Sequence, residues 1–458
     1  MNTTPSEVEV SQKSLRKSVA AGSIGVLVHW FDWAIYAYLA GTIAFVFFPQ
    51  QDKTAALLAV FAVFAISFGV RPIGALIFGA LGDRLGRKRT LSVVILAMAA
   101  STLMLGLLPS YNTIGIWAPV LLILARMVQG LAAGGEFGSA AAFLAEYSPT
   151  KRRGFGVSWI EVGSLLGFLL ASLTVVLLNT LLTTDSLHAW GWRIPFILTA
   201  PLGVIGFYIR NKIEDTPEFR SLAELESISK SPIKEVFTRN WKQLLQTSGI
   251  EIMMQVAFYI VLVYLLTYQE EVLGWTASSA ALLSTVASIT AIILVPIFGS
   301  MSDRYGRKPL LIGSAALLVI FSYPLFAIMQ SGTPWAGMVS TVGLGIILAI
   351  ILGVHAVTAA ELFPTRTRQS GLSIAYSVVA AIFAGTVPYV LTWGIAATGN
   401  TMLPAIYLIL IGVVGLGTMM TIKETKGIDL LRDDIAAAEA MKASSINVKK
   451  PLLPVDNG

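Results

Sequence analysis

A series of long apolar runs constrains the fold more than any other feature of the sequence. Runs of about 18 or more mostly apolar residues fall at roughly 19–48, 55–81, 90–109, 115–146, 156–180, 193–210, 244–269, 278–301, 309–330, 335–361, 370–397 and 402–422. A helix of about 20 apolar residues crosses the hydrocarbon core of a bilayer, because each residue adds about 1.5 Å to its length. The sequence therefore predicts an all-α integral membrane protein with twelve transmembrane helices.

The composition excludes several other classes of protein. Of the 458 residues, 55% are hydrophobic and only 13% are charged, which is too little charge to cover a soluble protein of this length. A net charge of +6 can indicate nucleic-acid binding, but lysine and arginine gather in short segments between the apolar runs. The chain has no cysteine and three scattered histidines, so it lacks metal-ligand spacing. We expect no nucleic-acid partner, no metal and no organic cofactor.

A strongly charged turn occurs twice in the chain. The pattern Gly-x-x-x-Asp-Arg-x-Gly-Arg-Lys begins at residues 79 and 299, and the pattern Ala-Glu-x-x-Pro-Thr begins at residues 145 and 360. The interval from Asp83 to Asp303 is 220 positions, and that from Glu146 to Glu361 is 215. Because both patterns recur in the same order, we interpret the chain as a duplicated six-helix half.

The duplication and the charge distribution together predict the topology. Nearly all lysine and arginine residues outside the apolar runs lie in the even-numbered turns and the terminal segments, which the positive-inside rule places in the cytoplasm. We expect a multi-pass protein of a bacterial-type plasma membrane with both termini cytoplasmic. The expected parts are a tail at 1–18, a six-helix half at 19–210, a linker at 211–243, a second six-helix half at 244–422 and a tail at 423–458.

Several motifs resemble one family of transporters. The two charged turns occur together with Trp30-Phe31-Asp32-Trp33, Arg71-Pro72-Ile73-Gly74, Arg126-Met127-Val128-Gln129-Gly130 and Trp190-Gly191-Trp192-Arg193. In this combination, over residues 20–425, the chain resembles the major facilitator superfamily and, within it, the metabolite:proton symporters. The resemblance implies a secondary active transporter, not an enzyme, that carries a small molecule by alternating access. Its expected partners are the substrate, the proton as coupling ion and the lipid bilayer, and we expect a monomer.

Asp32 and Arg126 are the first candidates for proton coupling. Counting from the ends of their runs places Asp32 about 20 Å and Arg126 about 17 Å into the membrane, near its middle. A charge there costs at least ~2.5 kcal/mol and usually marks a transport pathway or a proton relay. The resemblance implies that the two side chains pair, and a carboxylate that is alternately paired and unpaired changes its affinity for protons. A static pair that stabilises the first half is the alternative.

His29 and Glu136 are further candidates for proton coupling. His29 lies near Asp32 along the helix, so it could relay protons. Family members usually carry a glutamate at this place, which makes His29 a departure from the pattern. Glu136 follows two glycines within an apolar run, and these favour close helix packing. Glu136 either carries a proton or hydrogen-bonds a neighbouring helix.

The substrate candidates combine charged, polar and aromatic residues. Arg71 could bind a substrate carboxylate, with a structural role as the alternative. Glu251, Gln255 and Tyr259 are spaced at i, i+4 and i+8, so they share one helix face, and a polar face within a membrane more often lines a cavity than meets lipid. Aromatic rings can hold a quaternary ammonium by cation–π contact, although packing and interfacial anchoring explain most of them. The aromatic candidates are Trp30, Tyr36, Trp159 and Tyr376.

Eight charged residues of the duplicated patterns are candidates for a cytoplasmic gate. Charges at facing helix ends can form a network that closes the inner mouth and breaks when it opens. The resemblance implies this role, and a contribution to topology alone is the alternative. The gate candidates are Asp83, Arg84, Glu146 and Arg153 with their counterparts Asp303, Arg304, Glu361 and Arg368.

The membrane potential helps to rank the substrate classes. Moving one charge through 100 mV is worth ~2.3 kcal/mol, which a zwitterion gains when it is carried with one proton. A dicarboxylate needs at least about three protons before the potential helps, because two only neutralise its charge, and it hence needs several titrating groups. Asp32, Glu136, Glu161 and Glu251 could supply them. We expect a compatible solute such as proline or glycine betaine, and the alternative is an organic acid such as α-ketoglutarate or shikimate.

Overall fold

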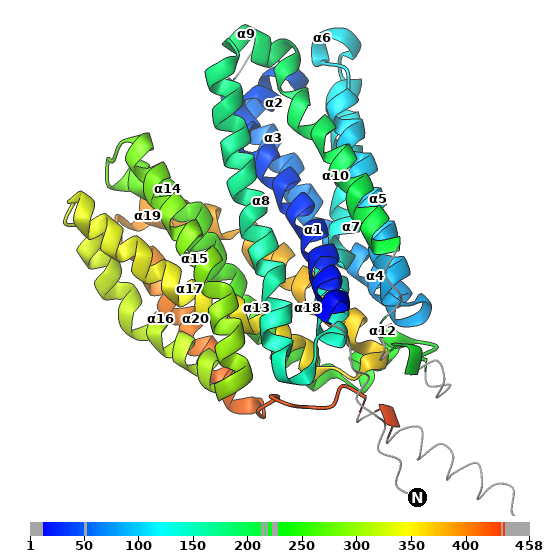
Figure 1. The fold of residues 1–458 in the computed structure, drawn as a ribbon. Helices are drawn as coiled ribbons and strands as arrows, with labels where there is room; N and C mark the ends of the chain where they lie inside the picture. The colour runs from blue at the N-terminus through cyan, green and yellow to red at the C-terminus, as the bar shows by residue number, and fades with distance from the viewer. Residues whose placement is uncertain are drawn as a thin grey trace, which may run out of the picture.

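The computed structural model describes residues 12–49, 53–211, 216, 219–221, 228–431 and 434–435, which are mostly helical (Figure 1). The first half contains α1 (Gln12–Tyr38), α2 (Ala40–Phe47), α3 (Lys53–Gly69), α4 (Arg71–Leu85), α5 (Arg87–Leu107), α6 (Tyr111–Ile114), α7 (Trp117–Tyr147), α8 (Arg153–Leu181), α9 (Thr184–Ser186) and α10 (Arg193–Asn211). The second half follows α12 (Pro232–Thr238) and contains α13 (Trp241–Phe258), α14 (Leu265–Thr267), α15 (Ala277–Tyr305), α16 (Arg307–Met329), α17 (Pro334–Leu362), α18 (Arg368–Val379), α19 (Val387–Thr398) and α20 (Leu403–Thr421).

The spanning helices occupy the predicted apolar runs. Ten helical stretches of the described residues are long and apolar enough to cross a membrane, and α1 with α2, bent by 69°, forms an eleventh when the pair is counted as one span. α10 lies at the remaining run, but its apolar stretch, Arg193–Ile205, is shorter. The predicted all-α membrane fold is confirmed, with ten or eleven spans by length and composition instead of the expected twelve.

The duplicated charged turn has the same backbone geometry in both halves. Gly86 separates α4 from α5 with a φ of 101°, and Gly306 separates α15 from α16 with a φ of 107°. Residues with a side chain rarely adopt such positive φ values, whereas glycine does so freely. The glycine therefore lets the chain turn within one residue, and the next residue, Arg87 or Arg307, already begins a helix.

Small residues bring α4 and α7 into close contact. A Cβ atom on Gly74 would lie 1.8 Å from the carbonyl oxygen of Leu131, and one on Gly134 would lie 2.0 Å from that of Arg71. Helices pack in this way in lipid, where the hydrophobic effect does not drive them together. The contact fixes the separation of the two helices that carry Arg71 and Glu136.

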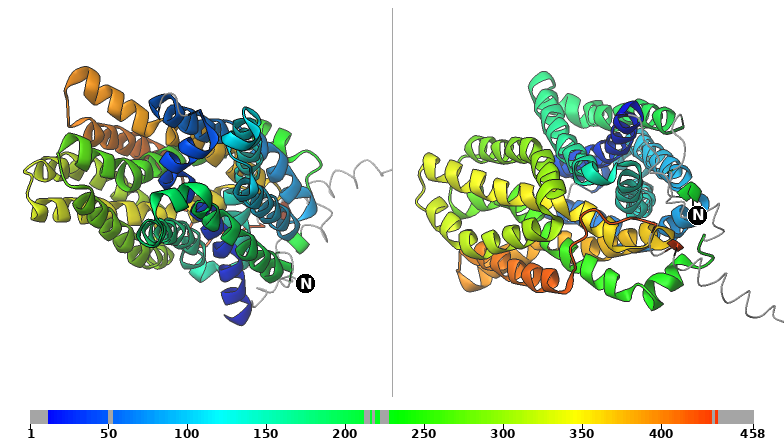
Figure 2. Two further views of the ribbon diagram at one scale, coloured as in Figure 1. Left: turned by 90° about the horizontal axis from the view of Figure 1, so that it is seen from above. Right: turned by 60° about the horizontal axis from the view of Figure 1, so that its bottom comes forward.

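The two halves meet through helices of both. α8 packs against α15 and α17, and α18 packs against α4 and α7. In the view from above, the first half (blue to cyan) lies beside the second (yellow to orange) (Figure 2). The helices of the two halves come together near the bottom of Figure 1 and diverge toward the top. We call the lower end, formed by the turns at Gly86 and Gly306 and the starts of α8 and α18, the motif end.

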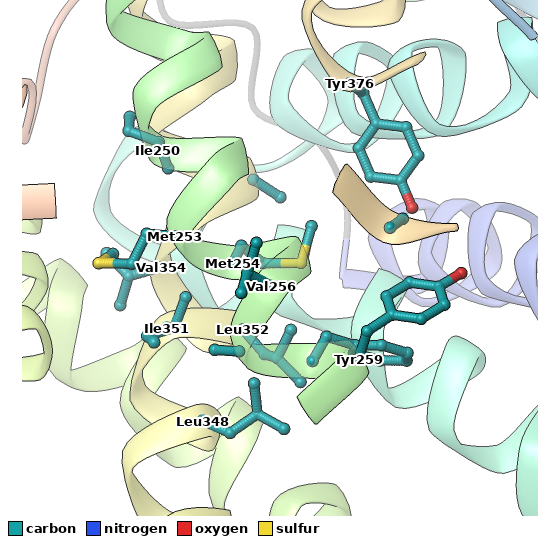
Figure 3. Packing of buried hydrophobic residues seen from close by; sticks show 14 of the residues in the cluster. Ile250, Met253, Met254, Val256, Tyr259, Leu348, Ile351, Leu352, Val354 and Tyr376 are labelled. Atoms are coloured by element: carbon teal, nitrogen blue, oxygen red, sulfur yellow. The ribbon is translucent and has the colours of Figure 1, made fainter. Parts of the chain in front are cut away.

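Aliphatic side chains hold the second half together. α13 and α17 interdigitate in a buried cluster, and Tyr259 and Tyr376 lie at its border (Figure 3). The cluster includes Ile250, Met253, Met254, Val256, Leu348, Ile351, Leu352 and Val354. This packing makes α13 and α17 a rigid support for the polar residues they carry.

The connecting segments differ in extent from the predicted parts. α1 begins at Gln12, within the predicted tail, and α12 lies within the predicted linker, while α13 begins at Trp241 instead of residue 244. Residues 424–430 of the predicted second tail pack against the motif end. The predicted tail segments at 1–11, 432–433 and 436–458 and the linker residues 212–215, 217–218 and 222–227 lie outside the described residues.

We expect Gly134→Leu to lower the apparent melting temperature of the purified protein. The new side chain would meet the backbone of α4, and overpacking of a close contact costs about 1–3 kcal/mol. Gly417→Leu is the matched control, because a Cβ atom there meets nothing within 4 Å. Equal melting temperatures for the two variants would show that the α4–α7 contact is not tight.

Candidate functional site

Asp32 and Arg126 lie together inside the first half. Arg126 Nη1 is 3.5 Å from Asp32 Oδ2, and neither side chain is more than 1% exposed. The guanidinium also stacks on the ring of Tyr36, 3.5 Å from the ring centroid. A buried carboxylate is costly unless a cation or hydrogen bonds offset its desolvation. The structure thus brings the two predicted residues into one buried site, carried by α1 and α7.

A glutamine not predicted from the sequence completes this pair. Gln129 Nε2 donates hydrogen bonds to Asp32 Oδ2 at 2.9 Å and to Thr102 at 2.7 Å, while Arg126 donates to Gln129 Oε1 at 3.0 Å. Gln129 lies three residues after Arg126, on the same helix face, and this spacing is the signal that could have identified it. Within the described residues, Asp32 Oδ1 and Arg126 Nε have no hydrogen-bond partner. The pair therefore keeps a free carboxylate oxygen that can accept a proton.

A small cavity lies beside this pair, between the first half and α18. Its volume of ≈ 10 Å³ accommodates about one water molecule. A larger solute therefore fits only after side chains or the two halves move. The cavity is lined by Val26, His29, Trp30, Arg71, Ala133, Glu136, Phe137 and Tyr376. The structure thus brings together two of the predicted proton-coupling residues and three of the predicted substrate residues.

His29 connects the cavity to the buried pair. Its Nδ1 atom is 3.1 Å from Glu136 Oε2, and the imidazole also interacts electrostatically with Asp32. The histidine ring packs against the ring of Trp33 with centroids 5.6 Å apart. Asp32, His29 and Glu136 therefore form a series of titratable groups that runs from inside the first half to the cavity.

Arg71 presents free hydrogen-bond donors at the cavity. The residue is 1% exposed, and its guanidinium lies 4.0 Å from the ring centroid of Trp33 and 4.2 Å from that of Phe68. Its Nε and Nη2 atoms have no hydrogen-bond partner within the described ranges. The guanidinium interacts electrostatically with Glu136 and Tyr376. The cavity thus combines free N–H donors of the Arg71 guanidinium with the carboxylate of Glu136 and with aromatic rings.

The other five substrate candidates lie outside the described lining of this cavity. Tyr36 packs on Arg126, as described above. Gln255 Nε2 donates to the backbone carbonyl of Tyr376 at 3.0 Å, and the carbonyl of the half-buried Trp159 accepts a hydrogen bond from Ser23 at 2.9 Å. Tyr259 lies at the border of the aliphatic cluster (Figure 3), and Glu251 contacts His355. The described part of the chain has no group of three or more histidine, cysteine, aspartate or glutamate side chains placed to hold a metal ion.

Buried arginines and glutamates form two matching pairs at the motif end. Arg87 Nε is 3.1 Å from Glu146 Oε2 in the first half, and Arg307 Nη2 is 3.1 Å from Glu361 Oε1 in the second. Neither arginine was among the predicted gate residues. Both occupy the same position of the duplicated turn, directly after its glycine, which is the signal that could have identified them.

A second arginine links each glutamate to the opposite half. Arg368 Nη1 of the second half is 2.7 Å from Glu146 Oε1, and Arg153 Nη1 of the first half is 3.0 Å from Glu361 Oε1. Each glutamate therefore binds one guanidinium from each half. Corresponding residues of the two duplicated patterns make corresponding contacts in the two clusters, and together the clusters join the halves at the motif end.

The duplicated aspartates make a different contact between the halves. Asp83 accepts hydrogen bonds of 2.8 and 3.2 Å from the first backbone N–H groups of α18, and Asp303 accepts bonds of 2.8 and 2.9 Å from those of α8. The first N–H groups of a helix lack partners within the helix and carry partial positive charge, so they bind a carboxylate well. Each aspartate thus caps a helix of the other half.

Arg84 and Arg304, which were predicted with the gate, lie outside these clusters. Both are exposed. Arg84 donates a hydrogen bond to the backbone carbonyl of Lys230, and Arg304 packs on the ring of Tyr305 at 5.3 Å. Neither forms an ion pair with another residue in the ranges that the structure describes. Of the eight predicted gate residues, the structure brings the other six together.

The segment after α20 crosses the motif end and adds to the clusters. Arg153 donates to the backbone carbonyl of Ile428 at 3.1 Å, and Arg368 donates to that of Leu430 at 3.3 Å. Burial by itself would raise the pKa of Glu424, but hydrogen bonds from the backbone N–H groups of residues 307, 426 and 308 hold that pKa below its usual value. The segment is therefore part of the closed arrangement.

We expect Glu146→Gln to weaken closure of the motif end. Removing one partner of a buried ion pair costs about 3–5 kcal/mol, because the remaining guanidiniums lose their counter-charge. Since each 1.4 kcal/mol is a factor of ten, a two-state opening equilibrium should shift at least about tenfold.

Ser370→Cys provides the measurement, because the chain has no native cysteine and Ser370 is fully buried between the halves. A membrane-permeant maleimide should label this cysteine at least about ten times faster when Glu146→Gln is also present. Arg304→Gln is the control and should leave the labelling rate unchanged, since Arg304 is exposed. An unchanged rate in the Glu146→Gln protein would show that this cluster does not hold the end closed.

Comparisons with known proteins agree with this architecture. The sequence matches the family described as sugar (and other) transporter over residues 18–230 and 220–434. It is 38% identical over 453 residues to the proline/betaine transporter of Escherichia coli K12, covering 96% of this chain and 90% of that protein. It is also 38% identical over 441 residues to the glycine betaine/proline/ectoine/pipecolic acid transporter OusA of Dickeya dadantii, covering 94% of this chain and 88% of that protein.

A solved structure shares the fold over nearly the whole chain. The major facilitator superfamily proton:xylose symporter XylE, bound to 6-bromo-6-deoxy-D-glucose, superposes with a TM-score of 0.74 at 18% sequence identity and covers 94% of this chain and 99% of that one. At 18% identity, the similarity to XylE shows only a shared fold. The family match and the proline/betaine transporter relatives show to which family the chain belongs. This multi-pass membrane protein therefore belongs to the sugar (and other) transporter family, and it has the fold of the major facilitator superfamily symporter XylE.

Proposed function

We propose that the protein is a proton-coupled symporter that imports a small zwitterionic compatible solute, such as proline or glycine betaine. The observation that carries this proposal is the free donor edge of Arg71 beside Glu136 in an aromatic cavity. A guanidinium binds a carboxylate through two parallel hydrogen bonds, and a carboxylate with aromatic rings suits an ammonium group. A zwitterion matches both charges of the cavity.

The same charges disfavour the alternative substrate class. An organic dianion could place one carboxylate on Arg71, but its second carboxylate would meet Glu136 or aromatic rings. Like charges in a buried site repel strongly because little water screens them. The names of the relatives add support, since proline, betaines, ectoine and pipecolic acid are all zwitterions near neutral pH. We therefore favour the compatible solute over α-ketoglutarate or shikimate.

Asp32 is the group that we propose to couple the proton to transport. Asp32 is buried and has one carboxylate oxygen without a hydrogen-bond partner in the described residues. The guanidinium of Arg126 stabilises the ionised carboxylate while the two side chains are paired, and no longer does so when they separate. His29 and Glu136 extend this site to the cavity, so a substrate ammonium near Glu136 changes the electrostatic field at Asp32. This arrangement allows substrate and proton to influence each other's binding.

The motif end is the gate in this proposal, and it faces the cytoplasm. The positive-inside rule supports the orientation, because the turns at this end carry most of the basic residues. The described state has this end closed by the arginine–glutamate clusters. Import then requires the clusters to separate after the substrate and proton have entered from the opposite side, and the protein is proposed to work as a monomer.

Uptake by purified protein in liposomes tests the function. Under an inward proton gradient we expect accumulation of labelled glycine betaine or proline, and we expect Asp32→Asn to abolish the gradient-driven part while exchange of labelled for unlabelled solute continues. An asparagine keeps the shape of the side chain but cannot titrate. Accumulation of α-ketoglutarate alone would replace the proposed substrate class, and no gradient-dependent uptake of any solute would reject the proposal.

A second experiment tests the role of Arg71 in binding. We expect Arg71→Gln to raise the KM for glycine betaine and proline by about tenfold or more, because hydrogen bonds to charged groups contribute about 1.5–3 kcal/mol. Arg304→Gln, which removes an exposed arginine of the same type, should leave KM unchanged. If both variants keep the wild-type KM, the carboxylate of the substrate does not bind Arg71.

A further inference from the structure

Three buried titratable side chains meet where the two halves join. His355 Nε2 is 3.2 Å from Glu161 Oε1, and His355 Nδ1 is 3.2 Å from Glu251 Oε1. None of the three residues is more than 4% exposed. Glu161 lies on α8 of the first half, whereas His355 on α17 and Glu251 on α13 belong to the second. The imidazole therefore bridges two carboxylates across the boundary between the halves.

The geometry of this triad implies that it holds an additional proton. A neutral imidazole has one N–H donor and one nitrogen that only accepts, and an ionised carboxylate only accepts. Both ring nitrogens of His355 face carboxylate oxygens. A neutral imidazole would donate one hydrogen bond, and at its other nitrogen a lone pair would face a lone pair of the second carboxylate. Both contacts are hydrogen bonds only if the histidine is an imidazolium or one carboxyl group is protonated.

Burial strengthens this conclusion. Without the additional proton, two negative charges would lie beside each other in a site that excludes water, and buried charges require pairing or hydrogen bonds. The ring of Phe137 stacks on the imidazole with centroids 5.7 Å apart and an interplanar angle of 14°, so one face of the histidine is apolar. One proton reduces the net charge of the triad from −2 to −1 and satisfies both ring nitrogens.

Few other charged groups face the triad. Tyr376 of α18 interacts electrostatically with Glu161, Glu251 and Arg71, and the ring of Phe137 stacks on Tyr376 as well as on His355. Tyr376 therefore lies between the triad and the substrate cavity. The remaining charged residues of α17 and the helices packed against it lie at the motif end, at the Asp32 site, at the cavity or at helix ends, and they are Arg126, Glu136, Glu146, Arg153, Lys242, Asp303, Arg304, Arg307, Lys308, Glu361 and Arg368.

The position of the triad connects it to the motif end. His355 is seven residues from the end of α17, and Glu161 is eight residues from the start of α8, so both lie about 10–12 Å inside that end. The contact between them is one of the polar contacts that join the halves farther inside than the arginine–glutamate clusters, together with those of Gln369 to Ser139 and of Ser377 to the carbonyl of Gly134. When the motif end opens, α8 must move away from α17, and Glu161 leaves His355.

We propose that Glu161, His355 and Glu251 form a second proton-binding site, which holds a proton while the motif end is closed and releases it when that end opens. The proton passes from a ring nitrogen of His355, or from a carboxyl oxygen, to water that enters between the halves. This release follows because, once Glu161 has moved away, only Glu251 remains to offset the charge of the bound proton. The inference rests on the proposed proton-coupled symport, and it adds a release site to the entry site at Asp32.

Spectroscopy of the purified full-length protein tests the proton without transport. Protein labelled with ¹⁵N-histidine should show His355 as an imidazolium at neutral pH, or else its infrared spectrum should show the C=O stretch of a buried protonated carboxyl group that Glu161→Gln or Glu251→Gln removes. His355→Gln assigns the histidine signal. His188→Gln is the matched control, because His188 lies at the opposite end and stacks on Phe45 at 4.1 Å. A neutral His355 with no such carboxyl band overturns the proposal.

Liposome experiments test the release step. In Glu161→Gln we expect proton-driven accumulation of glycine betaine to fall by about tenfold or more, because one coupled charge is lost, while gradient-free exchange falls much less. Equal losses in both assays, or wild-type accumulation in Glu161→Gln and His355→Gln, would overturn the coupling role. If wild-type protein itself shows no proton-driven uptake, the proposed function fails, and the spectroscopic result still decides whether the triad binds a proton.

Discussion

The structure depends above all on two glutamates that each bind two arginines at the motif end. Glu146 and Glu361 are buried, and each receives one guanidinium from its own half and one from the other. Charges of this kind are stable away from water only while they are paired. The contact between the halves is therefore nearly all or none, because separating one pair leaves buried charges that only incoming water can satisfy. The described state is the one in which these contacts are formed, and opening this end requires water to reach both glutamates.

A second set of buried charges has a different arrangement. The gate clusters are saturated with hydrogen bonds, whereas Asp32, Arg126 and Arg71 each keep polar atoms without a partner in the described part of the chain. Unsatisfied buried groups reduce stability, so folding alone does not favour them. They suit a site that must exchange a proton and a solute, since each new ligand can satisfy an atom that was left free. The contrast between saturated and unsaturated clusters matches the separate closing and binding roles that we propose for them.

The duplication is visible in the clusters at the motif end but not in the groups around Asp32 and the cavity. Each half supplies a glycine turn, a helix-capping aspartate and an arginine–glutamate pair, so the gate is nearly symmetric. The binding groups are not symmetric. Asp32, Arg71, Arg126 and Glu136 all belong to the first half, and the second half contributes Tyr376 and the Glu251–His355 part of the triad. Movement of one half relative to the other therefore changes the surroundings of every titratable group along the boundary.

The sequence by itself determined the helices, the duplication and the membrane setting, because the length and polarity of a run decide whether it can span a bilayer. It also singled out six of the eight charged residues that meet at the motif end, and the Asp32–Arg126 pair, since charges within apolar runs are few. The tertiary structure decided which charges meet. Arg84 and Arg87 are three residues apart in one turn, yet only Arg87 is buried, because the glycine between them redirects the chain. Likewise, His355 lies 194 and 104 positions from the two glutamates it bridges, and such a contact exists only once α8, α13 and α17 have packed together.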